Sequence, residues 1–236
     1  MPQHTKRSRF RRKDLRQPDE FETLTGRALA WARDRQQIVL GVLAAAAAVA
    51  LVALVVSRVG ASRAAAAGDA FRGAYATFQA GKFTEAADAF STVAHDYPRT
   101  AFGRLAGLYR GHALARQAAA GDAATAYTEY LATSPEAYLR QEALAGLGRA
   151  REASGDAAGA LEAYSEAGGL GGPFRSDALL SAARLHEAAG RPDQAREIYA
   201  RLLKEAADPE LRALLVAKLP PGSQEASDPG VAAAAP

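Results

Sequence analysis

Histidine and acidic side chains are the groups in this sequence that could do acid–base or metal chemistry, and their spacing does not bring them together. His4, His95, His112 and His186 stand one to a region, and the last two fall on different expected helices. The sequence has no phosphate-binding glycine loop, no nucleophile elbow and no His-Glu-x-x-His zinc motif. It also has no cysteine, which excludes thiolate catalysis and cysteine-bound zinc. We therefore expect a protein that is not an enzyme, with no catalytic residue, metal site or cofactor.

A second set of side chains is placed for binding. Counted back from four recurring glycines, these side chains fall on one side of the first helix of each repeated unit. We expect that side to form a groove for an extended or helical peptide segment, aromatic in the first unit and charged in the last ones. For Phe71 and Phe78 a place in the core is an equal alternative. The predicted protein-binding residues are Phe71, Tyr75, Phe78, Leu108, Glu142, Arg149, Glu152, Asp177, Arg184 and Glu187.

The elements that must position these side chains recur along the chain. The four glycines, each between two helical patterns, are separated by 40, 34 and 35 residues and are Gly81, Gly121, Gly155 and Gly190. An alanine follows each glycine by five residues, at Ala86, Ala126, Ala160 and Ala195. An aromatic residue follows by nine, and a proline closes or follows the second helix, at Pro98, Pro135, Pro173 and Pro209. Each glycine is expected in the left-handed conformation that ends a helix.

This register resembles the tetratricopeptide repeat (TPR), a helix–turn–helix unit of about 34 residues. Leu147-Gly148 matches the Leu-Gly pair of that family, whereas Leu114 replaces the small residue in the second unit. The tryptophan positions of the family hold Ala70, Arg110, Leu144 and Leu179. The resemblance implies an all-α fold, in which residues 64–219 form a TPR-like α-solenoid of about four helical hairpins. A generic alanine-rich helical bundle is the alternative.

Two segments follow from the same register. Residues 210–219 are expected to cap the solenoid with one further helix. The glycine-rich segment 168–173 is expected to be a loop before the last hairpin, with a flexible joint as the alternative.

An uncharged apolar segment precedes the repeats. Ile38 to Val56 comprises 19 residues of Ala, Val, Leu, Ile and Gly, which matches the thickness of a bilayer core. We expect a transmembrane helix over residues 38–57. A cleaved signal peptide ending near Val59-Gly60-Ala61 and a helix buried in a soluble protein are the alternatives.

The flanking charges predict which way this helix crosses the membrane. Residues 1–37 carry ten Lys and Arg against five acids, and form a basic arm with an amphipathic helix that starts at Asp19. Basic segments stay in the cytoplasm, so we expect a single-pass protein of the bacterial inner membrane with a periplasmic C-terminal domain. The arm is expected to contact anionic lipid, and no nucleic acid is expected to bind. Residues 220–236 are expected to be a disordered tail.

The layout of cytoplasmic arm, anchor and alanine-rich repeats resembles the ancillary subunit of the bacterial SecYEG translocon. The matching stretches are Ser62–Phe71, just after the anchor, and Ala178–Arg191, in the last hairpin. The resemblance implies a chaperone-like or docking role at the translocon, with an anchored peptidyl-prolyl isomerase as a partner. Two other hypotheses stay open: a scaffold of another envelope assembly (cell wall, motility or secretion machinery), and an accessory of an enzyme whose partner binds the basic arm.

Overall fold

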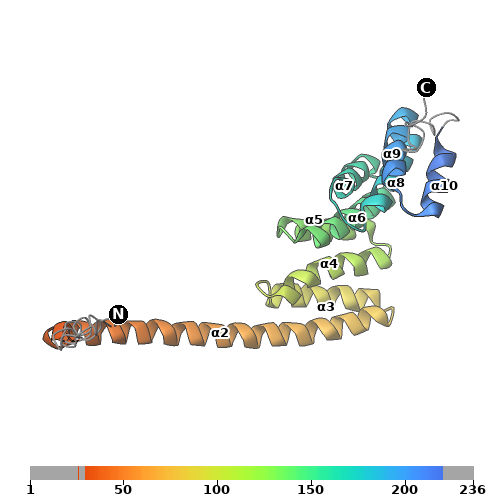
Figure 1. The fold of residues 1–236 in the computed structure, drawn as a ribbon. Coiled ribbons are helices and arrows are strands. Elements are labelled where there is room, and N and C mark those ends of the chain that lie inside the picture. Colours follow the sequence, from red (N-terminus) through yellow and green to blue (C-terminus); the bar gives the residue numbers. More distant parts are fainter. Residues whose placement is uncertain (1–25, 27–29, 220–236) are drawn as a thin grey trace, which may run out of the picture. The chain divides into compact units, whose positions relative to one another are not determined.

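The computed structural model describes residue 26 and residues 30–219, and every regular element within them is a helix (Figure 1). The expected start of the amphipathic helix at Asp19 and the expected tail over residues 220–236 lie outside this range. The chain divides into two compact units, Met1–Gly60 and Ala61–Pro236. Helix α2 (Gln36–Gln79) begins in the first unit and continues into the second, so the expected anchor and the first repeat share one helix.

The described part of the first unit consists mainly of the apolar part of α2. Its most apolar 18-residue window has a mean hydropathy of 2.9, and none of that window is buried within the chain. Val49, for example, is 70% exposed. Among the described residues, α2 is therefore the one helix long and apolar enough to cross a membrane. Within the described residues nothing buries this window, so the structure gives no support to the alternative of a helix buried in the core.

The second unit is a series of antiparallel helical hairpins, as the repeat pattern predicts (Figure 1). In each hairpin we call the first helix A and the second helix B. The C-terminal part of α2 is the first helix A, and its partner is α3 (Phe83–Asp96). The next three hairpins are α4 (Ala101–Arg116) with α5 (Ala120–Ala132), α6 (Ala137–Ala153) with α7 (Ala157–Gly169), and α8 (Arg175–Ala188) with α9 (Pro192–Glu205). Helix α10 (Pro209–Lys218) then packs on α9 and occupies the place of the expected capping helix.

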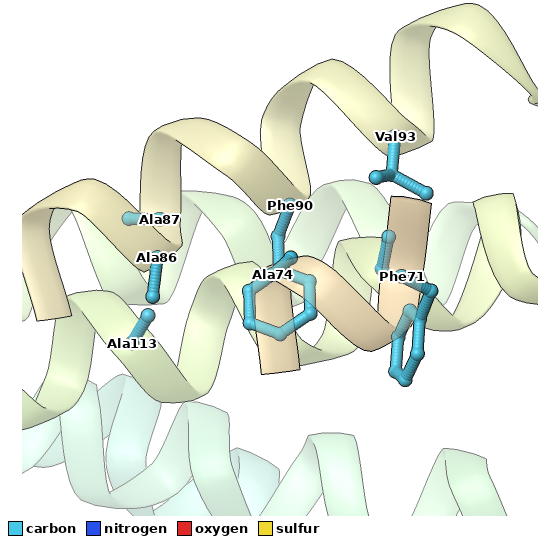
Figure 2. Close-up of a cluster of buried hydrophobic side chains, with 8 residues drawn as sticks. Phe71, Ala74, Ala86, Ala87, Phe90, Val93 and Ala113 are labelled. Carbon is cyan, nitrogen blue, oxygen red and sulfur yellow. The ribbon is translucent and has the colours of Figure 1, made fainter. Parts of the chain in front are cut away.

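Alanines let the helices of this solenoid approach closely, and aromatic rings fill the remaining space. In the first hairpin, Ala86 and Phe90 of α3 have no exposed surface. Figure 2 shows Ala86 beside Ala113 of α4, while Phe71 of α2 lies near Phe90. Because an alanine-rich helix has little side-chain volume to bury, no hairpin can form a core alone, and each shares its core with the next.

The turn between helices A and B confirms the predicted role of three glycines and corrects the fourth. Gly81, Gly155 and Gly190 have positive φ angles of 77°, 86° and 69°. Gly121 instead lies inside α5, and Ala118 adopts the left-handed conformation in its place with φ 61°. Alanine reaches this conformation at a cost of roughly 1–2 kcal/mol, so its residue type did not mark the turn.

Counting from Ala118 shifts the second unit by three residues and makes the register more regular. The turn residues are then 37, 37 and 35 residues apart. The core positions of the second helix are Ala123, Tyr127 and Tyr130, which are 0%, 1% and 3% exposed. The small residue of helix A is Gly111, so the predicted departure at Leu114 is wrong. The family's tryptophan position is likewise Gly107 and not Arg110.

Candidate functional site

The A helices carry side chains at equivalent positions that the B helices leave at least partly uncovered. Six residues before the turn stand Tyr75, His112, Arg149 and Arg184. Three residues before it stand Phe78, Ala115, Glu152 and Glu187. All eight are exposed or half-buried, and we call the surface they form, with the side chains that contact them, the helix-A face.

Tyr127 of helix B reaches this face through a gap left by glycines. A Cβ atom on Gly111 of α4 or on Gly146 of α6 would lie 2.7 or 2.6 Å from the Tyr127 ring, so only glycine fits without displacing the ring. The hydroxyl of Tyr127 lies 2.8 Å from Nδ1 of His112. The ring is therefore core, while the hydroxyl belongs to the helix-A face.

The Tyr127 hydroxyl fixes how His112 bonds to the next hairpin. Burial raises the pKa of Tyr127, so the hydroxyl keeps its proton and donates to Nδ1 of His112. We assign the imidazole hydrogen to Nε2, which then donates to Oε1 of Glu142 at 3.1 Å. Helices α4, α5 and α6 are thus joined by one polar chain of three side chains.

Tyr164 makes the same kind of contact one hairpin further along. Its ring packs against Gly148, and its hydroxyl donates to Oε2 of Glu152 at 3.3 Å. Burial raises the pKa of Tyr164 to about 12. Arg184 of α8 also bonds to Glu152, at 2.7 Å, and this hydrogen bond lowers the pKa of the Glu152 carboxyl. The α6–α8 step of the face therefore has an ionised acid held by two donors.

Charge pairing continues to the end of the solenoid, whereas Arg149 of this face takes no part in it. Lys218 of α10 lies 3.1 Å from Glu187 of α8. Arg149 is exposed and makes no ion pair within residues 30–219. Its positive charge opposes the effect of burial, which raises the pKa of both Tyr127 and Tyr164. Arg149 is the basic group of this face most available to a ligand.

Aromatic side chains form the opposite end of the face. The Tyr109 ring of α4 lies 5.3 Å from Phe71, 5.4 Å from Tyr75 and 6.3 Å from Phe78. Tyr75 and Phe78 are half-buried, whereas Phe71 is 8% exposed and belongs to the core. These edge-to-face contacts hold the aromatic groups in a fixed arrangement.

The structure brings most of the predicted groove residues onto one surface. Glu152 contacts Arg184, and Glu142 and Glu187 each contact a cation or histidine of a neighbouring hairpin. Asp177 is exposed and makes no ion pair in the described part of the chain. Leu108 has no exposed surface and lies in the core. It had been counted from Gly121, and from Ala118 it occupies the position equivalent to Phe71.

Three aromatic or histidine residues of the A helices escaped the sequence analysis. His112 stands six residues before Ala118, so the corrected register would have placed it with Tyr75 and Arg149. Tyr109 contacts both His112 and Tyr75, and Tyr138 is 55% exposed with its ring 5.9 Å from Phe174. Nearby charge and hydroxyl groups, Glu142 and Tyr138 included, add to the effect of burial in raising the pKa of Tyr109.

The chemistry of this arrangement is recognition through hydrogen bonds, charge and aromatic contact. Within the described residues, no three His, Asp or Glu side chains come close enough to hold a metal ion. His186 lies on α8, away from His112 on α4, and burial lowers its pKa.

Comparison with protein families gives one match, a model of the tetratricopeptide repeat over residues 153–219. This range covers the end of the third hairpin, the fourth hairpin and α10. No curated protein matches the chain.

Solved structures share the fold over a longer part of the chain. A tetratricopeptide repeat protein from Parabacteroides merdae ATCC 43184 is 16% identical with a TM-score of 0.55, over 64% of this chain and 58% of that one. A Podosopora anserina protein with nearly identical TPR-like repeats is 17% identical with a TM-score of 0.51, over 64% and 82%. MamA protein is 18% identical with a TM-score of 0.51, over 64% and 87%. The second unit is thus a TPR-like solenoid, a fold whose stacked repeats create extended binding surfaces and generally serve protein interaction.

Proposed function

We propose that this chain is a membrane-anchored adaptor that binds peptide segments of partner proteins on the helix-A face, in the manner of a scaffold or chaperone-like subunit. The observation that carries the proposal is the continuity of that face. Polar or aromatic contacts join α2 to α4, α4 to α6, α6 to α8 and α8 to α10. A long ligand would therefore meet one connected surface with groups held in place before binding.

The membrane part of the proposal rests on α2. The most apolar window of α2 has a mean hydropathy of 2.9 and no buried residue. Exposing such a surface to water is unfavourable, so the helix needs an apolar surrounding. We propose that lipid does so, with the basic arm on the cytoplasmic side of a bacterial inner membrane. Protease added to intact spheroplasts should then digest the solenoid and spare the arm. Digestion of the arm with a protected solenoid would reverse the orientation.

The resemblance to the translocon's ancillary subunit supplies the proposed place of action, beside the SecYEG translocon and an anchored peptidyl-prolyl isomerase. Crosslinking of the full-length protein in its membrane, followed by identification of the crosslinked partners, tests this. Recovery of translocon subunits together with nascent exported chains supports the proposal. Recovery of a cell-wall, motility or secretion complex without them would favour a scaffold of that assembly.

The helix-A face itself is tested by Arg149→Ala combined with Arg184→Ala. These exposed arginines differ from Arg201 and Arg212, which are also exposed but lie on α9 and α10. We expect the first pair to reduce the yield of crosslinked partner and the control pair, Arg201→Ala with Arg212→Ala, to leave it unchanged. Equal yields from both pairs would show that the face does not bind the partner.

A further inference from the structure

A pocket opens at the junction of α4, α5 and α6. Its volume is about 510 Å³, and its apolar walls include Phe102 and Leu105 of α4, Tyr130 of α5 and Leu139 of α6. Thr133, Ser134, Pro135 and Glu136, between α5 and α6, also line it, as does Arg104 of α4. A space of this size is ample for one large side chain of a partner.

The next junction of the solenoid has the equivalent space filled by the chain itself. Gln141 of α6 stands 14 residues before its turn residue, as Arg104 does, and it has no exposed surface. Its amide donates to the carbonyls of Ala167 and Leu170 at 3.0 and 3.1 Å. Its oxygen accepts from the backbone N–H of Phe174 at 3.3 Å. Gln141 thus ties the α7–α8 loop down and occupies the space between α6 and that loop.

The α4–α6 junction lacks this filling for identifiable reasons. Arg104 is exposed, and its guanidinium donates to the carbonyl of Arg99 on its own side of the junction. The carbonyl of Tyr130, equivalent to that of Ala167, already accepts from the Thr133 hydroxyl at 2.7 Å. Leu139 stands 16 residues before its turn, where the neighbouring repeats have Phe102 and Phe174. A smaller side chain and an outward arginine leave the space open.

The surroundings of this hollow are unusually apolar for an exposed place. Beyond Val59, the described chain has three exposed large apolar side chains: Phe102 at 41%, Tyr138 at 55% and Leu214 at 50%. Phe102 lines the pocket, and Tyr138 precedes Leu139 in the pocket wall. Exposed apolar groups gathered around a preformed hollow are typical of a binding site.

We infer that this pocket is the anchor site for a large apolar side chain of the partner segment, with an acidic residue next to that side chain meeting Arg104. Arg104 makes no ion pair with any described residue, so its charge is open to a ligand carboxylate. The inference rests on the proposed peptide-binding function and adds a position and a residue class to it. The ligand is a protein segment that combines an apolar anchor with an adjacent carboxylate.

Residues at equivalent positions of the neighbouring repeats guide the choice of variants that test the pocket. Leu139→Phe introduces the residue found at the equivalent position of both neighbouring repeats and narrows the pocket. Arg104→Ala removes the charge and, unlike Gln141 at the equivalent position, has no amide that could tie down the α5–α6 loop. Phe174→Leu makes the reverse change one junction further along and is the matched control. Circular dichroism of each full-length variant in lipid nanodiscs checks that the solenoid is folded.

The probes are fluorescein-labelled octapeptides of glycine and serine with a central aspartate–phenylalanine pair, read by fluorescence anisotropy. Replacing the phenylalanine by alanine should weaken binding to the wild-type protein by about tenfold, and replacing the aspartate by serine by a few-fold. Leu139→Phe should weaken the preference for phenylalanine, and Arg104→Ala should abolish only the preference for aspartate. Phe174→Leu should keep both.

Two results would overturn the pocket assignment: no preference for phenylalanine in the wild-type protein, or the same preference after Leu139→Phe. The helix-A face can still bind partners in either case, because partner capture that depends on Arg149 and Arg184 does not involve the pocket. Conversely, pocket binding without such dependence would retain the anchor site and reject the helix-A face.

Discussion

Small residues in the A helices decide where the polar groups of the helix-A face stand. Gly111 and Gly146 leave the gap through which the Tyr127 hydroxyl reaches His112, and Gly148 does the same for Tyr164. Each tyrosine therefore contributes a buried ring and a hydrogen-bonding tip, a division that suits a residue between core and surface. A repeat with phenylalanine at this position, such as Phe90 in the first hairpin, lacks the tip and has an aromatic face instead.

Backbone conformation at the A–B turns predicts that one substitution lowers the stability of the solenoid and that two others raise it. Gly155→Ala should cost roughly 1–2 kcal/mol, because a φ of 86° is strained for alanine. Ala118→Gly should stabilise the solenoid by about 0.5–1 kcal/mol, since it relieves the same strain at φ 61°. Gly121→Ala should also stabilise, by about 0.5 kcal/mol, because Gly121 lies inside a helix. Urea unfolding followed by circular dichroism measures all three, and destabilisation by Gly121→Ala would restore the original register.

The Arg184–Glu152 contact predicts a pH dependence of stability. Arg184 holds the pKa of Glu152 below 4.5, so its contribution is fully present above pH 4.5 and is lost as the pH falls through the lowered value. The difference in unfolding free energy between the wild type and Glu152→Gln should therefore be constant near neutral pH and shrink in acid. Urea unfolding at several pH values tests this, with Arg184→Ala as the variant in which the acid dependence should be weaker. A difference that grows on acidification would contradict the assignment.

At the scale of elements, the sequence allowed the prediction of hairpins, their order, the final helix and the prolines after each B helix. These features depend on local signals, namely helical periodicity, glycine turns and proline. The error at Gly121 arose because Ala118 makes its turn without a residue type that marks one. The sequence could not predict which junction is filled and which is open, for another reason. Whether Gln141 is buried and Arg104 exposed depends on how neighbouring hairpins pack.

The capping helix should have a local role. Leu215 of α10 has no exposed surface and packs in the cluster that includes Leu179, Tyr199 and Leu202. Leu215→Ala should cost about 2–4 kcal/mol in that cluster. Because repeats contact only their neighbours, hydrogen exchange should accelerate in α8–α10 and remain unchanged in α4 and α5. Uniform acceleration along the solenoid would show that the repeats unfold as one unit.

At the scale of the whole molecule, the buried and exposed apolar groups are separated along the chain. Every buried hydrophobic residue in the described range lies at or beyond Ala67, whereas the exposed apolar run lies before residue 60. The solenoid therefore has a complete core of its own. Within the described residues, none of the apolar window of α2 is buried.

This separation predicts the effect of charges in the apolar helix. Val49→Arg with Val52→Arg should cost several kcal/mol of membrane insertion, at roughly 3 kcal/mol for each arginine near the centre of a membrane helix. The variant should leave the membrane fraction on carbonate extraction and keep the helical circular dichroism of the solenoid. Val49→Leu with Val52→Leu is the control that should remain in the membrane. An arginine variant that stays membrane-bound would assign the attachment to another part of the chain.

The aromatic residues of the two units also differ in kind, which gives each unit its own optical signal. The single tryptophan, Trp31, precedes the apolar run and is 56% exposed, and all eight tyrosines lie in the second unit. Tryptophan emission should respond when the first unit meets lipid and stay silent when the solenoid unfolds. The near-ultraviolet dichroism of the tyrosines should behave in the opposite way. One unlabelled sample can therefore report membrane contact and repeat folding as two independent spectra.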